Sequence, residues 1–175
     1  MKLTLSERFR ALFQEPIATT RAIGIAEGQT VADIGAGLGY FTIPAAIIVG
    51  QTGLVYSVEP DPARSDRIRD RVLAEKLENV RVLTTGAEKL GDIPSGSVDL
   101  AFSAFSMHHL NDRQAGLAEI KRILREGGNF YVWDRVPGMI VRHGTRPEEL
   151  DQISPGFSKL ELLDTGRTLR ARFTK

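Results

Sequence analysis

The residues best suited to chemistry gather in the short stretch 33–40, where Asp33 is followed by glycines at positions 35, 37 and 39. Glycines at alternate positions let a backbone bend tightly and let a ligand lie against it without meeting a Cβ atom. An apolar run precedes the stretch and a helical pattern follows it. The loop therefore leads from a buried strand into a helix, whose first N–H groups and dipole attract polar ligands.

The ligand expected at this loop carries an ammonium group rather than a phosphate, because Asp33 would repel a pyrophosphate. The dinucleotide spacing G-x-G-x-x-G would also require glycine where Tyr40 stands. The stretch Asp33-Ile-Gly-Ala-Gly-Leu-Gly39 instead resembles the first motif of the class I methyltransferases that use S-adenosylmethionine. The resemblance implies that the amino-acid end of this cofactor lies against the loop. The contacts implied there are Asp33, Gly35, Ala36, Gly37, Gly39 and Tyr40.

A second acid, Glu59, follows the apolar run 54–58, about twenty residues after the glycine loop. A carboxylate at that place accepts hydrogen bonds from both hydroxyls of a ribose that the first loop holds. The alternative role of capping the next helix is disfavoured, because Asp61 and Pro62 already supply an N-cap and a first-turn proline. Glu59 and its neighbour Pro60 are therefore predicted to contact the cofactor.

The third segment of the predicted cofactor site is Gly86-Ala87-Glu88. The class I methyltransferases often read Gly-Asp-Ala-Glu here, and their aspartate accepts from the adenine amino group. Gly86 stands at that position, so the resemblance implies that adenine is held by the backbone at Ala87 and by apolar contacts. Glu88 has two readings, either as a replacement for that acid or as a helix-start residue favoured by the dipole.

The fourth segment begins at Ser103, after the apolar strand 98–102, and reaches the pair His108-His109. Ser103 is predicted to contact the cofactor. Histidine suits proton removal near neutral pH, so His108 and then His109 are the candidate general bases. The alternative is that they only enter a helix or pack under Leu110. Neither a metal-ligand set nor a nucleophile triad accompanies them. The segment 106–110 resembles that of the quinone-precursor methyltransferases, and Phe9, Phe13, Phe105 and the connection 136–144 are candidates for the acceptor pocket.

The elements that must position these residues alternate as strand and helix five times, and an antiparallel pair follows. Such alternation predicts an α/β fold with helices on both faces of a parallel sheet. The resemblance implies a Rossmann-like, seven-stranded, mostly parallel sheet with a C-terminal hairpin. One domain is expected over residues 1–175, with a short helical segment in 1–26, including a helix at 6–13, and the core in 27–175. Three local expectations accompany it: Asn111 caps the helix ending near 124, Thr145 and Glu148 form a capping box, and Arg170 and Arg172 are exposed.

Composition bounds the remaining classes of function. The chain of 175 residues has a net charge of +1 and no cysteine, which removes disulfides, thiolate metal sites and cysteine nucleophiles. No segment approaches the roughly 20 apolar residues that span a bilayer, and the first residues lack the apolar core of a signal peptide. A cytoplasmic protein without a membrane partner is expected. The charge neither supports nor excludes a nucleic-acid partner.

The sequence thus predicts an S-adenosylmethionine-dependent methyltransferase that moves a methyl group to a small molecule by in-line displacement and releases S-adenosylhomocysteine. The alternatives left open are a methyltransferase of RNA or protein and a degenerate module that only binds a partner. A homo-oligomer that completes the site is also left open. A nicotinamide dehydrogenase is disfavoured by Tyr40 and Asp33.

Overall fold

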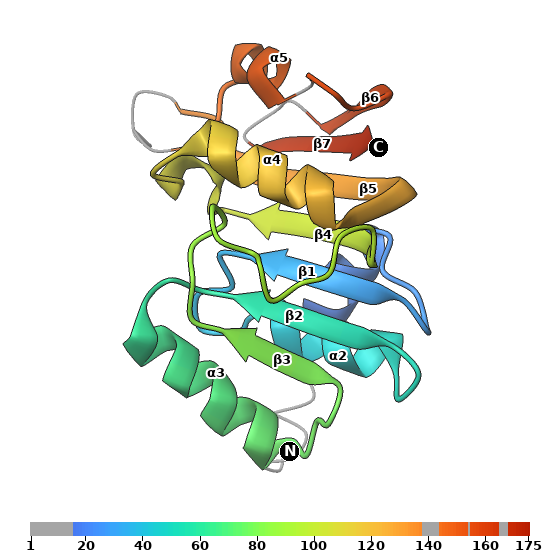
Figure 1. Ribbon diagram of the computed structural model, residues 1–175, viewed down its shortest axis with the longest axis vertical. Helices are drawn as coiled ribbons and strands as arrows, with labels where there is room; N and C mark the ends of the chain where they lie inside the picture. Colours follow the sequence, from blue (N-terminus) through green and yellow to red (C-terminus); the bar gives the residue numbers. More distant parts are fainter. Residues whose placement is uncertain (1–15, 138–143, 154, 165–167) are drawn as a thin grey trace, which may run out of the picture.

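A seven-stranded mixed sheet in the order β3-β2-β1-β4-β5-β7-β6 forms the centre of the computed structural model (Figure 1). The structure describes residues 16–137, 144–153, 155–164 and 168–175. The first five strands pair in parallel, and β7 runs antiparallel between β5 and β6. This confirms the predicted fold class and its C-terminal antiparallel hairpin. The strands are β1 (Thr30–Ile34), β2 (Leu54–Val58), β3 (Val80–Leu83), β4 (Val98–Ala104), β5 (Leu124–Arg135), β6 (Lys159–Asp164) and β7 (Thr168–Thr174).

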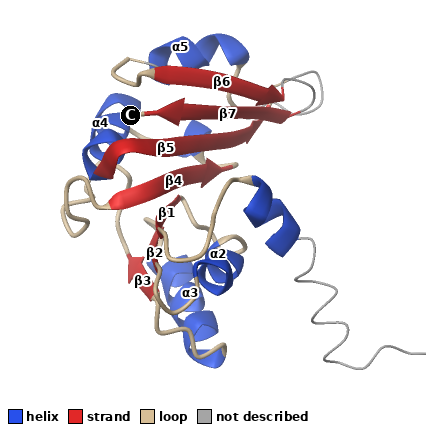
Figure 2. Cartoon of the chain, turned by 90° about the vertical axis from the view of Figure 1, so that its right-hand side faces the viewer, coloured by secondary structure: helices blue, strands red, loops and turns tan. Residues whose placement is uncertain are grey.

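Helices cover both faces of this sheet, as expected when crossovers join parallel strands. Figure 2 shows α4 on one side of the sheet, with α2 and the helix at residues 16–22 on the other. Short 3-10 turns, η1 and η2, precede α4 and α5. The helical bounds are α2 (Thr42–Val49), α3 (Pro62–Ala74), η1 (Met107–His109), α4 (Arg113–Ile123), η2 (Pro147–Glu149) and α5 (Leu150–Ile153).

The alternation along β1 explains the two cores and the position of its acid. Ala32 and Ile34 belong to the apolar core that includes α4, and Val31 belongs to the core that includes α2. Successive side chains of a strand point to opposite faces, so Asp33 lies on the face of Val31. It meets α2 there, where the Thr42 hydroxyl donates to its carboxylate at 2.7 Å.

The local capping expectations had mixed outcomes. Asp61 caps α3 as predicted, and its carboxylate accepts from the Ala63 amide at 2.8 Å. The expected cap of α4 at Asn111 was wrong, because Asp112 accepts from the Ala115 amide at 3.0 Å. The expected capping box at Thr145 was also wrong, because its hydroxyl donates to the buried carboxylate of Asp134 instead. Leaving the buried carboxylate without hydrogen-bond donors would cost more free energy than leaving the start of a short helix uncapped.

The expected exposure of Arg170 and Arg172 was likewise wrong, since both are half-buried. Arg170 lies over the Trp133 ring, with its guanidinium carbon 4.6 Å from the ring centroid. Arg172 donates to the Ile23 carbonyl and pairs with Glu161. The predicted helix at 6–13 lies outside the described residues. Among the helices that the structure does describe, none has the length and apolarity to cross a membrane.

Candidate active site

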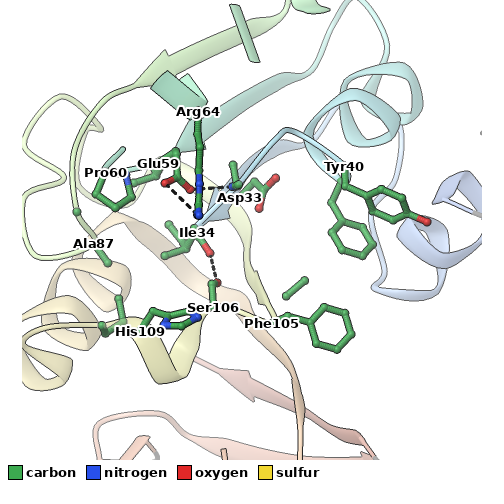
Figure 3. Close-up of a pocket in the computed structure, with 18 of the residues that line it drawn as sticks. Asp33, Ile34, Tyr40, Glu59, Pro60, Arg64, Ala87, Phe105, Ser106 and His109 are labelled. Carbon is green, nitrogen blue, oxygen red and sulfur yellow. Dashed lines mark hydrogen bonds and ion pairs between the residues drawn. The ribbon is translucent and has the colours of Figure 1, made fainter. Parts of the chain in front are cut away.

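A cavity of about 790 Å³ opens at the carboxyl ends of β1, β2 and β4 (Figure 3). Parallel sheets bind ligands at this edge, where the strand order reverses, and the volume lies in the usual range for ligand sites. Segments from four distant parts of the sequence meet here. The sequence-predicted residues that line it are Asp33, Gly35, Ala36, Gly37, Tyr40, Glu59, Pro60, Gly86, Ala87, Glu88, His109 and the acceptor-pocket candidate Phe105.

The glycine loop has the backbone that only glycine adopts readily. Gly35, Gly37 and Gly39 have φ angles of 77°, 60° and 75°. The amides of Gly35 and Ala36 both donate to the Val58 carbonyl, at 2.8 and 2.9 Å. These bonds join the loop to the end of β2, so two of the loop's amides fix its own shape.

Two of these glycines form a matched pair for testing the loop. A Cβ atom at Gly35 would lie 2.6 Å from the Ser106 hydroxyl oxygen, whereas one at Gly37 would meet nothing within 4 Å. We expect Gly35→Ala to lower the free energy of unfolding by at least about 2 kcal/mol, from backbone strain and from displacing Ser106. Gly37→Ala should cost about 1 kcal/mol, from strain alone. Urea denaturation followed by circular dichroism measures both, and equal losses would show that Ser106 yields without cost.

Glu59 lies at the cavity edge with its carboxylate already oriented. Glu59 is only 3% exposed. Its oxygens accept from the Gly37 amide at 2.8 Å and from the Asp61 amide at 3.1 Å. Arg64 approaches to 3.9 Å from the solvent side. The carboxylate thus holds the glycine loop and the start of α3 together beside the predicted ribose position.

Burial dominates the electrostatics of Asp33. Desolvation raises the pKa of this carboxyl from 3.8 to about 7, the Thr42 hydroxyl opposes the rise, and the negative charge of Glu59 adds to it. Asp33 is only 2% exposed but lines the cavity, so a cationic group of a bound ligand can lie beside its carboxyl. Opposite charge beside a buried carboxyl favours its ionised form.

The segment 86–88, predicted to border adenine, lines the cavity, but Glu88 is in a turn rather than in a helix. Its carboxylate accepts from the Asp112 amide at 3.1 Å, just before α4 begins. Glu88 therefore does meet a helix start, although that helix is α4 and not one of its own. Ala87 is buried in the apolar core and contributes an apolar surface to the cavity lining.

Three sequence-predicted site residues do not line the cavity. Gly39 packs against Ile68 of α3, and Ser103 is buried with its hydroxyl 2.6 Å from that of Ser106. His108 turns away, and its Nδ1 atom lies 2.9 Å from a carboxylate oxygen of Asp134.

The two adjacent histidines therefore occupy different environments. The Asp134 carboxylate is fully buried and also accepts from the Thr145 hydroxyl and the Arg135 amide, both at 2.8 Å. His109 lines the cavity, and its ring centroid is 4.0 Å from that of His108. The geometry therefore favours His109 for contact with a bound molecule and assigns His108 to holding η1 on the end of β5.

The cavity also contains residues that sequence reasoning missed. Ser106 donates to the Ile34 carbonyl at 2.7 Å and so joins the ends of β1 and β4. Arg64 and Trp133 line the wall, at the start of α3 and near the end of β5. Trp133 could have been predicted in the cavity from its position at the carboxyl end of β5, the strand next to β4. The place of Arg64 in the cavity lining could not, because it depends on the contact of its side chain with Glu59.

The polar groups that line the cavity fit a nucleoside with a positively charged amino-acid end. Two buried carboxylates face the cavity, and apolar side chains and backbone fill the space beyond Pro60. No group of three or more metal-ligating side chains occurs among the described residues. The site can thus hold a ligand that carries a cation and a ribose, with the cation beside one carboxylate and the ribose beside the other.

Comparison with known proteins matches residues 32–132 to the model of a methyltransferase domain. The chain is 33% identical over 130 residues to aklanonic acid methyltransferase DauC of Streptomyces sp. strain C5, covering 73% of this chain and 57% of that protein. It is 31% identical over 118 residues to the ubiquinone/menaquinone biosynthesis C-methyltransferase UbiE of Psychromonas ingrahamii, covering 65% and 45%. The chain thus spans about half the length of the curated relatives it matches.

A similar fold occurs in the crystal structure of a SAM-dependent methyltransferase from Aquifex aeolicus. The TM-score is 0.76 at 24% identity, and the superposition covers 94% of this chain and 91% of that one.

Proposed function

The chain belongs to the class I S-adenosylmethionine-dependent methyltransferases, and from this premise we propose that it transfers the cofactor's methyl group to a small-molecule acceptor. The observation that supports this most is the convergence of Asp33, Glu59 and Ala87 on one cavity at the carboxyl edge of the sheet. Two relatives, DauC and UbiE, are named for small-molecule substrates.

In this proposal the chain's residues chiefly hold donor and acceptor in line. Asp33 receives the ammonium group, Glu59 receives the ribose hydroxyls, and the backbone at Gly86 and Ala87 borders the adenine. S-adenosylmethionine supplies an activated methyl group, so positioning is the main task, and positioning can provide roughly 7–11 kcal/mol. His109 hydrogen-bonds the acceptor and takes its proton where one must leave.

Calorimetric titration with S-adenosylmethionine and S-adenosylhomocysteine tests the proposal. Saturable binding of both, together with transfer of labelled methyl into the small-molecule fraction of a cell extract, is expected. Absence of binding at millimolar ligand contradicts the enzyme and favours a module that only binds a partner. Label in RNA or protein fractions alone would support the other alternative.

The histidine pair allows a prediction about the reaction. We expect His109→Gln to lower kcat about a hundredfold while leaving cofactor affinity within twofold, since a general base contributes about a hundred- to ten-thousandfold. His108→Gln should lower kcat by about tenfold through misplacement of η1. Single-turnover transfer at saturating cofactor measures the rates. A larger loss from His108→Gln would reverse the assignment of roles.

The same proposal extends to the whole chain. We propose that residues 27–175 form the methyltransferase domain, with the helix at residues 16–22 before it. The protein acts in the cytoplasm on a dissolved acceptor. A homo-oligomer in which a second copy of the chain completes the site is the alternative to a monomer, and gel filtration of the active species distinguishes the two.

A further inference from the structure

One end of the cavity is aromatic, and of its four rings only Tyr40 belongs to the predicted cofactor contacts. Its rings come from Tyr40, Phe41, Phe105 and Trp133, which we call the aromatic wall. The Phe105 and Trp133 centroids are 4.9 Å apart, and those of Phe41 and Trp133 are 5.8 Å apart. In Figure 3, Tyr40 and Phe105 lie across the cavity from Pro60 and Ala87.

The backbone at this wall is held in an unfavourable conformation. Phe105 has a φ angle of 58°, in the left-handed region that bulky side chains rarely adopt. Its amide donates to the Trp133 carbonyl at 2.7 Å, which fixes the end of β4 against β5. Such strain is concentrated at ligand sites, because the surrounding fold must enforce it. Here it turns the Phe105 ring toward the cavity.

Charge is distributed unevenly along the cavity. The carboxylates of Asp33 and Glu59 lie at the cofactor end, with Arg64 beside the latter. At the aromatic wall, the Arg135 guanidinium is 5.6 Å from the Phe105 centroid, and that of Arg170 is 4.6 Å from the Trp133 centroid. The buried Trp133 Nε1 and Arg170 Nε atoms have no hydrogen-bond acceptor within the described chain. The two guanidinium groups do not line the cavity themselves, but they place positive charge within 5.6 Å of the centroids of two rings of the wall.

We propose that the aromatic wall is the acceptor subsite and that it selects a planar aromatic ring bearing an acidic oxygen, either a phenol or an aromatic carboxylic acid. The inference rests on the proposed function and names its substrate class. Rings pair with aromatic side chains at centroid distances of 4.5–7 Å, and the two guanidinium groups favour the ionised oxygen.

The reaction at this subsite balances without any further reactant. The acceptor oxygen forms a bond to the methyl carbon as the bond from that carbon to sulfur breaks, and the electron pair of that bond stays on sulfur. Oxyanion and sulfonium thus become a neutral ether or ester and a neutral thioether. A phenol first gives its proton to His109, whereas a carboxylate has none to give.

Trp133 makes the subsite directly observable, because it is the single tryptophan of the chain. With S-adenosylhomocysteine present, we expect 4-nitrobenzoate to quench the fluorescence in a saturable way. The uncharged 4-nitrobenzamide should bind at least tenfold more weakly, and cyclohexanecarboxylate should give no saturable change. N-acetyltryptophanamide in solution corrects for collisional quenching.

Variants that remove one positive charge test how much the guanidinium groups contribute to binding, apart from the shape of the aromatic wall. Arg170→Gln and the more exposed Arg135→Gln should each weaken 4-nitrobenzoate binding three- to tenfold. Arg67→Gln, on the exposed surface of α3, is the matched control and should change nothing. Calorimetric affinity for S-adenosylhomocysteine should be the same in all three variants. Labelled-methyl transfer to 4-methylphenol, which is protonated at pH 7, should fall in His109→Gln while transfer to 4-nitrobenzoate does not, which distinguishes the two kinds of acceptor.

Equal affinity for 4-nitrobenzoate and 4-nitrobenzamide, or no response of Trp133 to either, would overturn the inference. If S-adenosylhomocysteine still binds in that case, only the acceptor assignment fails. If S-adenosylhomocysteine does not bind, the proposed function fails, and the fluorescence titration without it still reports on the aromatic wall.

Discussion

Glu59→Ala is expected to lower the affinity for S-adenosylmethionine by a hundredfold or more. Two charge-assisted hydrogen bonds to a ribose would be lost, and each is worth about 1.5–3 kcal/mol. The same carboxylate accepts from the Gly37 amide at 2.8 Å, so the substitution also frees the glycine loop. Isothermal titration calorimetry gives the affinity directly.

Glu59→Gln provides the matched control for that experiment. Its carbonyl oxygen can still accept one hydrogen bond, so the loss should lie between wild type and Glu59→Ala. Thermal unfolding of the unliganded variants separates loop disorder from lost ligand contacts. An affinity of Glu59→Ala within threefold of wild type would mean that the ribose lies elsewhere.

Asp33→Asn is expected to stabilise the unliganded protein and to weaken its binding of the cofactor. Burial raises the pKa of Asp33 from 3.8 to about 7, and a tenfold change in proton affinity corresponds to 1.36 kcal/mol. The folded state therefore loses about 4 kcal/mol relative to the unfolded chain as the pH rises from about 4 to above 7. The asparagine has no charge to bury, so this part of the pH dependence should disappear.

Urea denaturation at pH 5 and pH 8 measures this effect. The difference in unfolding free energy between Asp33→Asn and wild type should be larger at pH 8 than at pH 5. A cationic ligand beside Asp33 should also expel its proton, so wild type should release protons on binding near pH 6.5. Calorimetry in buffers of different ionisation enthalpy detects that release. Its presence in Asp33→Asn would assign the proton to another group.

The sequence predicted most residues that line the proposed cofactor end of the cavity, because backbone geometry brings them there. Gly35 and Gly37 require left-handed φ angles, and strand order brings Glu59 to the same edge as the loop. Such features follow from local spacing and from the topology of parallel sheets. They depend little on which side chains pack nearby.

The residues that were misjudged depend on rotamers and on partners distant in sequence. Ser103 lies within β4 and Ser106 just after it, and only the contact with the Ile34 carbonyl shows that Ser106 reaches the cavity. His108 and His109 are adjacent, and their different orientations follow from the buried carboxylate of Asp134. No local pattern in the sequence reveals a partner 26 residues away.

The hydroxyl of Ser106 has a consequence for how such an enzyme changes over evolutionary time. By donating to the Ile34 carbonyl it links the ends of β1 and β4 beside the proposed position of the methyl donor, and the carboxylate of Glu59 holds the neighbouring loop. The rings opposite are joined mainly by side-chain packing, so substitutions among them leave that scaffold intact. We therefore expect that substitutions in the aromatic wall change which acceptor is methylated, while the proposed cofactor end of the cavity is unaffected.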